Sequence, residues 1–159
     1  RREQIFMEKM KIYREFGISG IIWFCLNDYR TQMGEEGEGR LRRRVHGSAD
    51  LYGNPKPSYE TVKRECAPLY ISSINAVNTD EKTSGVEIVI ANKNALPCYE
   101  AKGYHLAGFD GTGCLISYTA LTPLKPGETQ KIFLADAQSQ LARIAIQRPN
   151  GAESISYFI

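Results

Sequence analysis

Hydrophobic positions along the first part of the chain predict one amphipathic helix and one buried strand. Apolar residues recur at helical spacing across residues 3–16, with charged residues on the opposite face, and Gly17 is suited to end the helix. Residues 18–27 form a short apolar run without polar alternation. Such a run is typical of a strand that is buried on both faces in a parallel sheet, so we expect a strand there.

The next stretch has the pattern of a loop that leads into a second helix. Residues 31–56 are polar and lack periodicity, and a segment of this length is usually functional or mobile. Its last residues, Asn54-Pro55-Lys56-Pro57, are a turn signal. Pro57 or Ser58 then predicts the start of a short helix that ends near Glu65.

From residue 67 onward the pattern predicts only strands and turns. Several runs alternate, as with Val86, Ile88 and Ile90, and sequences rich in Gly and Pro separate them. Seven short strands in roughly ninety residues are the expectation for an immunoglobulin-like β-sandwich. The seven runs are 69–78, 85–91, 103–109, 114–121, 129–135, 141–147 and 153–159.

The sequence therefore divides into two parts of different class. We expect residues 1–66 to be a partial α/β segment and residues 67–159 to be an all-β sandwich, which together make a mixed fold class. The chain begins with Arg1 and enters a helical pattern at once, so we expect both ends to be cut from a longer protein.

Composition and charge narrow the classes of function. Apolar residues make up 42% of the 159 residues and charged residues 24%, which is ordinary for a soluble globular protein. The net charge of +2 favours no nucleic-acid partner. The longest apolar run, Gly20 to Leu26, is too short to span a membrane. We therefore expect neither a nucleic-acid nor a membrane partner, and the cellular compartment stays open.

Four cysteines add little to this picture. Cys25, Cys66, Cys98 and Cys114 have no metal-binding spacing and are too few and too scattered for a disulfide framework. We expect free thiols that are mostly buried. A disulfide between Cys98 and Cys114 is the alternative, so the redox state of these two residues stays open.

A tryptophan-containing stretch and a downstream Pro-Lys-Pro stretch stand out together. They read Gly20-Ile21-Ile22-Trp23-Phe24-Cys25-Leu26-Asn27-Asp28-Tyr29 and His46-Gly47-Ser48-Ala49-Asp50-Leu51-Tyr52-Gly53-Asn54-Pro55-Lys56-Pro57-Ser58-Tyr59. The combination resembles glycoside hydrolase family 2, the β-galactosidases and β-glucuronidases. The resemblance implies that residues 1–66 are the last strand and flanking helices of a TIM barrel and that an immunoglobulin-like domain follows. It also implies that the parent protein is a retaining β-glycosidase acting on β-linked sugars.

The same resemblance places the two catalytic glutamates of that family upstream of Arg1. Retaining hydrolysis needs two carboxylates about 5 Å apart, and no glutamate here matches the catalytic motifs of the family. Asn27 also stands where relatives often have Asp. We therefore expect no catalytic residue and no cofactor in this chain, and we expect the chain alone to be inactive.

Trp23, Asn27 and Asp28 are the predicted substrate-binding residues. In strand alternation Trp23, Cys25 and Asn27 share one side, near the strand end where barrel sites lie. The family uses its matching Trp to stack on a sugar, and the competing interpretation is a Trp in the core. Asn27 and Asp28 either bind sugar hydroxyls or end the strand in a turn, with Asp28 paired to a nearby Arg.

Other polar residues carry weaker hypotheses. Glu35, Glu36 and Glu38 lie among glycines, which predicts a solvated loop rather than a catalytic pair. His46 and His105 have no ligand partners in register, so we expect no metal site.

The expected partners follow from the resemblance. They are a carbohydrate substrate and the rest of the parent barrel, and a homo-oligomer stays open. The alternative function, from another class, is a non-catalytic carbohydrate- or protein-binding β-sandwich module that uses its aromatic residues as a binding face.

Overall fold

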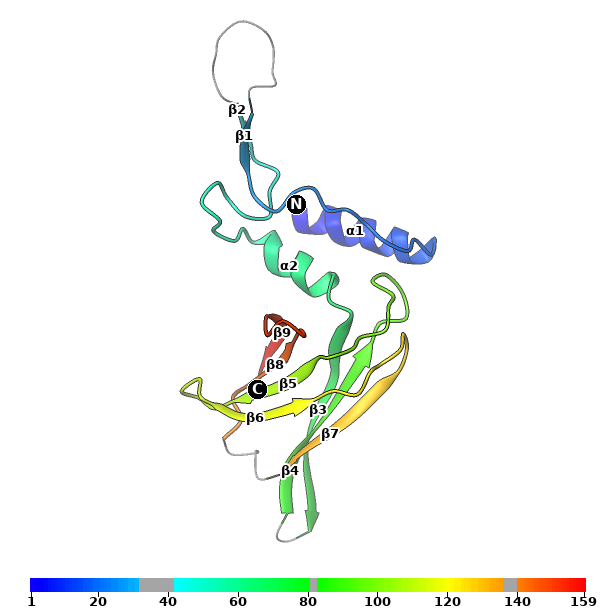
Figure 1. Cartoon of the computed structure of the whole chain (residues 1–159), viewed down its shortest axis with the longest axis vertical. Helices are drawn as coiled ribbons and strands as arrows, with labels where there is room; N and C mark the ends of the chain where they lie inside the picture. The colour runs from blue at the N-terminus through cyan, green and yellow to red at the C-terminus, as the bar shows by residue number, and fades with distance from the viewer. Residues whose placement is uncertain (32–41, 81–82, 136–139) are drawn as a thin grey trace, which may run out of the picture. The chain divides into compact units, whose positions relative to one another are not determined.

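The chain folds into two compact units. The computed structural model describes residues 1–31, 42–80, 83–135 and 140–159 (Figure 1). Unit 1 comprises Arg1–Glu65 and unit 2 comprises Cys66–Ile159. The division falls one residue before the boundary expected from the sequence, where the helical pattern gives way to strands.

Unit 1 contains helices α1 (Arg2–Glu15) and α2 (Ser58–Glu65) and the short strands β1 (Tyr29–Thr31) and β2 (Arg42–Arg44). The two strands pair antiparallel. Both helices lie where the sequence pattern predicts them.

The end of α1 is fixed by Gly17. This residue has φ +65°, a left-handed conformation that glycine adopts without steric cost. The N–H of Gly17 donates to the Arg14 carbonyl at 3.2 Å, and the N–H of Ile18 donates to the Tyr13 carbonyl at 2.9 Å. These two bonds satisfy carbonyls that the last helical turn leaves unpaired, in the manner of a Schellman motif.

Helix α1 packs on unit 1 along one narrow stripe. Phe6 and Met10 are each 1% exposed, whereas Ile5, Met7 and Ile12 are between 41% and 49% exposed. Helix α2 is tied to α1 by polar groups, because the Arg14 guanidinium lies 2.9 Å from a Glu65 carboxylate oxygen. Ile5, Met7 and Ile12 therefore lie on the exposed side of α1.

The expected α/β assignment for residues 1–66 is wrong. The named strands of the described residues all pair antiparallel, and none of them lies in residues 18–27. The described chain is mostly β, with two helices, and it contains no strand or helix arrangement of a TIM barrel. An apolar run has the composition of a buried parallel strand, but a strand also needs neighbours that take its backbone hydrogen bonds, and composition does not supply them.

The described residues of unit 2 form seven strands in two antiparallel sheets. The first sheet has the order β3-β4-β7 and the second the order β6-β5-β8-β9. The strands match the seven runs expected from the sequence. Two antiparallel sheets are loosely compatible with an immunoglobulin-like domain, but they do not identify that class. The bounds are β3 (Leu69–Asp80), β4 (Thr83–Asn92), β5 (His105–Phe109), β6 (Leu115–Ala120), β7 (Thr129–Ala135), β8 (Arg143–Gln147) and β9 (Glu153–Phe158).

The core of unit 2 lies between these two sheets. Ile88 and Ile90 of β4 and Ile144 and Ile146 of β8 are each 0% exposed and belong to one cluster. Alternation along each strand sends these side chains to the same face, which is why the sequence pattern locates the core correctly.

The buried side-chain amide of Asn92 connects two loops of unit 2. Asn92 is 2% exposed, and its amide nitrogen donates to the carbonyl of Tyr99 at 2.9 Å and to that of Leu124 at 2.8 Å. Buried carbonyls need such partners, so Asn92 holds the loops after β4 and before β7 in place.

None of the four cysteines forms a disulfide. Cys25 and Cys66 are partly buried, and Cys98 and Cys114 are exposed. The expectation of mostly buried thiols is therefore wrong, while no disulfide joins Cys98 to Cys114.

Candidate functional site

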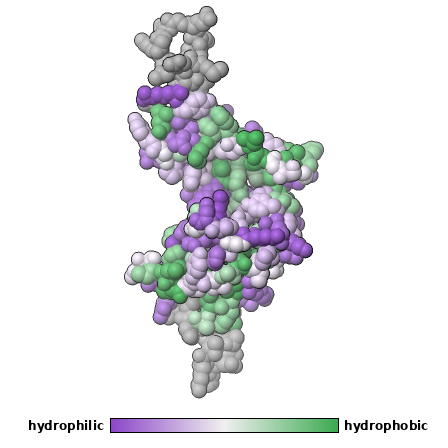
Figure 2. All heavy atoms as spheres, in the orientation of Figure 1, coloured by the Kyte–Doolittle hydropathy of each residue, from purple (hydrophilic) through white to green (hydrophobic). Residues whose placement is uncertain are grey.

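The segment from Ile21 to Asn27 is extended and has two unlike faces. Ile22, Phe24 and Leu26 are 95%, 64% and 64% exposed, while the residues between them are partly buried. The period of two expected for an extended chain is therefore present. Figure 2 shows apolar residues at the surface in this part of the molecule.

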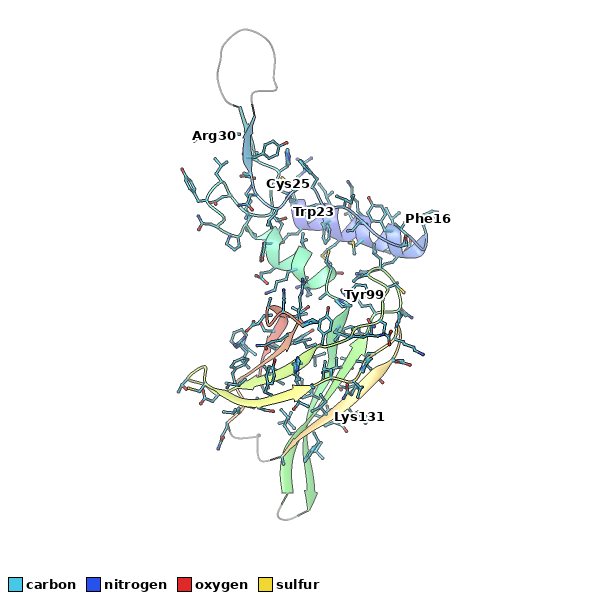
Figure 3. The ribbon with its side chains drawn as sticks, in the orientation of Figure 1. Phe16, Trp23, Cys25, Arg30, Tyr99 and Lys131 are labelled. Carbon is cyan, nitrogen blue, oxygen red and sulfur yellow. The ribbon has the colours of Figure 1, made fainter. Side chains whose placement is uncertain are left out.

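Trp23 lies on the inner side of this segment, beside α1 (Figure 3). Its indole N–H donates to the Ser48 hydroxyl at 2.8 Å. Its ring meets Phe6 edge-on at 4.6 Å between centroids, and the Arg2 guanidinium lies 5.3 Å from the ring centroid. The indole thus has a polar partner and an aromatic neighbour, the combination that half-buried Trp residues usually find.

A hollow of about 430 Å³ opens next to Trp23. Its lining comes from α1, through Phe6, Lys9 and Tyr13, and from the segment that runs from Ile18 to Phe24. The volume lies within the range of small-molecule sites. Trp23 is therefore neither sealed in a core nor fully exposed.

Residues 25–28 are held against residues 47–49 by backbone hydrogen bonds. The N–H of Ser48 donates to the Cys25 carbonyl at 3.1 Å, and the N–H of Ala49 donates to the Leu26 carbonyl at 2.7 Å. The N–H of Asp28 donates to the Ala49 carbonyl at 2.9 Å. Two stretches more than twenty residues apart in the sequence therefore form one structural element.

Gly47 makes this approach possible. A Cβ atom at this position would overlap the backbone of Asn27 and Asp28. The N–H of Gly47 donates to a carboxylate oxygen of Asp28 at 2.9 Å, and its carbonyl accepts from Arg2 at 2.6 Å. The requirement for glycine here comes from close approach of two backbones rather than from a positive φ.

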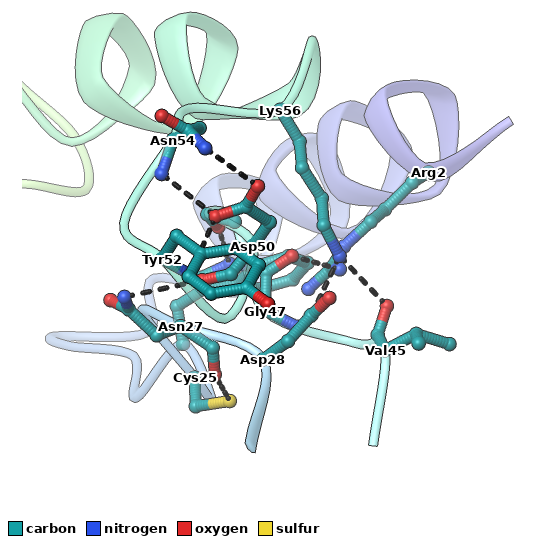
Figure 4. A network of polar contacts seen from close by, with 12 residues as sticks. Arg2, Cys25, Asn27, Asp28, Val45, Gly47, Asp50, Tyr52, Asn54 and Lys56 are labelled. Atoms are coloured by element: carbon teal, nitrogen blue, oxygen red, sulfur yellow. Dashed lines mark hydrogen bonds and ion pairs between the residues drawn. The ribbon is translucent and has the colours of Figure 1, made fainter. Parts of the chain in front are cut away.

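Asp28 is the buried acid of the site. It is 9% exposed, and the Lys56 ammonium lies 2.6 Å from the same oxygen that accepts from Gly47 (Figure 4). Lys56 also donates to the Val45 carbonyl at 3.1 Å. The Lys56 hydrogen bond, with help from the Gly47 N–H, holds the pKa of Asp28 below its ordinary value, against the opposing effect of burial.

Asp50 shapes the loop that follows. Its carboxylate accepts from the backbone N–H groups of Tyr52 and Asn54, at 2.8 and 2.9 Å, and from the Asn54 amide at 2.9 Å. The Asn54 hydrogen bonds lower the pKa of Asp50. The Asn27 amide nitrogen donates to the Asp50 carbonyl at 3.3 Å, so Asn27 joins the same network.

These contacts define what the site is able to do. The carboxylates of Asp28 and Asp50 are both engaged by hydrogen-bond donors, so neither is an unengaged nucleophile or acid. Within the described residues no group of three or more His, Cys, Asp or Glu is placed to hold a metal ion. Among those residues no helix is long and apolar enough to cross a membrane. The geometry suits binding and positioning rather than proton transfer.

The three predicted site residues do come together in one region of unit 1. Trp23 contacts residue 48, Asn27 contacts residue 50, and Asp28 pairs with Lys56, whereas the alternative to sugar binding pairs it with an Arg. Sequence reasoning missed Lys56 and Asp50 as members of the network, although both lie in the stretch that carries the resemblance. Glu35, Glu36 and Glu38 lie outside the described residues.

Acid should weaken unit 1 through Asp28. Because the folded-state pKa of Asp28 is below the ordinary value of 3.8, its stabilising effect is present above that pH and is lost as the pH falls through the folded pKa. We expect the urea midpoint of unit 1, followed by Trp23 fluorescence, to fall between pH 5 and pH 2.5. In the Asp28→Asn variant, the urea midpoint of unit 1 should be lower than that of the wild type at pH 7 and should change less as the pH falls.

Asp110→Asn is the matched control for this measurement. Asp110 is a turn-forming acid of unit 2, whose pKa is lowered by its hydrogen bond to Thr112. Its replacement should leave the Trp23 signal as in the wild type. An Asp28→Asn variant whose midpoint falls with acid as steeply as that of the wild type would contradict the role given to Asp28.

Comparison with known proteins does not assign the chain to a family. No family model matches the sequence, and no curated protein matches it. Among solved structures, the chain is similar to a penta-heme cytochrome c552 from Thermochromatium tepidum, with 9% identity and a TM-score of 0.34. The match covers 96% of this chain but 65% of the cytochrome chain. A likeness at this level carries no argument about fold or function.

Proposed function

We propose that this chain is a portion of a retaining β-glycosidase, similar to the β-galactosidases of glycoside hydrolase family 2. The parent enzyme hydrolyses β-linked sugars, and Trp23, Asn27 and Asp28 border its sugar subsite. One observation carries the proposal. The two stretches on which the sequence resemblance rests, residues 20–29 and 46–59, fold against each other in the structure.

Each predicted residue has a distinct role in this proposal. Trp23 offers an apolar ring face at the edge of a hollow, which is complementary to the C–H face of a pyranose. Asn27 is partly exposed, and its amide oxygen has no protein partner within the described part of the chain, so it is placed to accept from a sugar hydroxyl. Asp28 is too buried for broad contact and positions the loop through Lys56.

The catalytic carboxylates of the proposed enzyme come from another part of the parent protein. The described acids near Trp23 are engaged in structural bonds, and retaining chemistry needs two carboxyl groups about 5 Å apart. No cofactor is required for that chemistry.

The part of the parent enzyme that supplies the catalytic carboxylates also covers the exposed apolar residues of unit 1. Ile22, Phe24 and Leu26 project from one face of the extended segment, and an apolar ridge of this kind is typical of a surface that contacts another polypeptide. We infer that the rest of the parent enzyme packs there.

Hydrolysis of aryl glycosides tests the proposal. The full-length protein encoded by the gene that contains this sequence should hydrolyse an aryl β-galactoside or β-glucuronide, and the product should retain the β configuration. The 159-residue chain alone should give no turnover above a blank. Turnover by the pure chain would contradict the assignment of the catalytic groups to another part of the protein.

A further inference from the structure

We propose that the hollow beside Trp23 binds an aromatic carboxylate, as the aglycone of the glycoside that the parent enzyme cleaves. The inference rests on the proposed function and adds the class of group that is attached to the sugar. The hollow has a volume of about 430 Å³ and is lined by residues of α1 and of the segment 18–24. Asn27 and Asp28, the polar residues of the proposed sugar subsite, are not part of its lining.

A second, smaller hollow has the polar lining that a sugar needs. Asp28, Asp50 and Tyr52 line it, and its volume is about 150 Å³. Carboxylate and phenol oxygens accept hydrogen bonds from hydroxyl groups. Phe24 lines the first hollow and Asp28 the second, and four residues of extended chain span at most about 14 Å. One glycoside is therefore able to place its sugar at the second hollow and its aglycone at the first.

Aromatic rings form much of the wall of the first hollow. Phe6 and Tyr13 of α1 line it, together with Trp23 and Phe24 of the extended segment. The rings of Phe6 and Trp23 meet edge-on with centroids 4.6 Å apart, so their orientation is set before a ligand enters. Aromatic rings attract a further ring through offset or edge-to-face contacts, which an alkyl chain does not make. The lining therefore favours an aryl group over an acyl chain.

Lys9 gives the first hollow a positive charge. Within the described part of the chain, it is the only lining residue with a charged side chain. On a helix, the neighbours of a side chain are the residues three and four positions away. For Lys9 none of these neighbours is acidic, since they are Ile5, Phe6, Ile12 and Tyr13. The ammonium of Lys9 is therefore not neutralised by its own helix.

The charges at the two hollows are opposite in sign. Lys9 lines the first hollow, whereas the carboxylates of Asp28 and Asp50 belong to the lining of the second. A carboxylate on the sugar would meet like charges at the second hollow, while a carboxylate on the aglycone would meet the ammonium of Lys9. Aromatic walls and one cation together point to an aryl carboxylate as the aglycone.

Binding of small acids to the 159-residue chain tests this inference. The readout is Trp23 fluorescence, because the only tryptophan of the chain lines the hollow. Hydrocinnamate is the probe. Its amide has the same ring without the charge, and hexanoate has the charge without the ring. We expect hydrocinnamate to bind at least about threefold more tightly than either comparison, which is the discrimination that an exposed ion pair or a ring contact supplies.

Two variants and two matched controls locate the site on α1. Lys9→Met should lower the affinity for hydrocinnamate to the affinity for its amide, and Tyr13→Ala should weaken binding of both by removing one wall. Lys11→Met and Ile12→Ala are the controls, because neither residue lines the hollow and Lys11 already pairs with Glu15 at 3.9 Å. Both control variants should bind hydrocinnamate as the wild type does.

Several results would overturn the inference. It fails if hydrocinnamate does not bind, if hexanoate or the amide binds as tightly, or if Lys9→Met keeps the wild-type affinity. It also fails if Lys11→Met weakens binding as much as Lys9→Met. Should Tyr13→Ala unfold unit 1, Lys9→Met decides, because Lys9 is exposed. These measurements involve no hydrolysis, so the inference and the glycosidase proposal are able to fail separately.

Discussion

Replacing Gly47 with alanine is expected to abolish the folded structure of unit 1. The added Cβ would overlap the backbone of Asn27 and Asp28 and would lie 2.7 Å from the Ala49 carbonyl oxygen. None of these atoms belongs to a flexible side chain, so the two stretches must separate. Separation breaks the hydrogen bonds from Ser48 and Ala49 to residues 25 and 26 and withdraws Ser48 from the Trp23 indole. We expect the free energy of unfolding of unit 1 to fall by about 3 kcal/mol or more, which is at the upper end of the range for overpacked sites.

Trp23 fluorescence measures this effect directly, because it is the only tryptophan in the chain. Emission should shift to the value of the urea-unfolded chain, while the β signal of unit 2 in circular dichroism persists. Gly20→Ala is the matched control, since nothing lies within 4 Å of a Cβ at that position, and it should change stability by less than about 0.5 kcal/mol. Wild-type emission and a wild-type urea midpoint in Gly47→Ala would refute the close-approach argument.

Replacing Trp23 with alanine is expected to reduce kcat/KM of the parent enzyme tenfold to a hundredfold. Loss of a stacking contact with the sugar should cost about 1–3 kcal/mol in the transition state. Trp23→Phe keeps a flat ring but loses the N–H that Ser48 accepts, so its kcat/KM should lie between those of the wild type and Trp23→Ala. The measurement is steady-state kinetics on variants whose melting temperatures match the wild type.

The structure also gives Trp23 a packing role, and that role predicts a different result. The indole contacts Phe6 and Arg2, so truncation leaves a cavity that costs about 3–5 kcal/mol if packing dominates. In that case Trp23→Ala would melt early, and the enzyme that remains folded would keep its kcat/KM. Such a result would remove Trp23 from the sugar subsite.

Local sequence signals predicted much of the fold. Gly17 ends α1, Ser58 begins α2, and the alternation around Ile88 and Ile144 places strands and core correctly. Each of these features depends on residues close together in the sequence. The buried parallel strand expected at residues 18–27 failed because pairing depends on distant residues that an apolar run does not specify.

The candidate site shows the same limit. Asp28 pairs with Lys56 across 28 positions, and Trp23 bonds to Ser48 across 25. No periodicity in the sequence connects these residues. The resemblance identified both stretches, but it did not indicate that Asp28 and Lys56 form an ion pair. Burial of the cysteines was also misjudged, because a thiol packs in a core only where the fold provides one.

Steady-state hydrolysis by the full-length gene product tests the central proposal most directly. The substrates are 4-nitrophenyl β-galactoside and 4-nitrophenyl β-glucuronide, with the α-galactoside as the stereochemical control and the 159-residue chain assayed in parallel. The proposal predicts turnover of at least one β-glycoside, no turnover of the α-glycoside, and no turnover by the chain alone. A folded full-length protein that hydrolyses neither β-glycoside would contradict it.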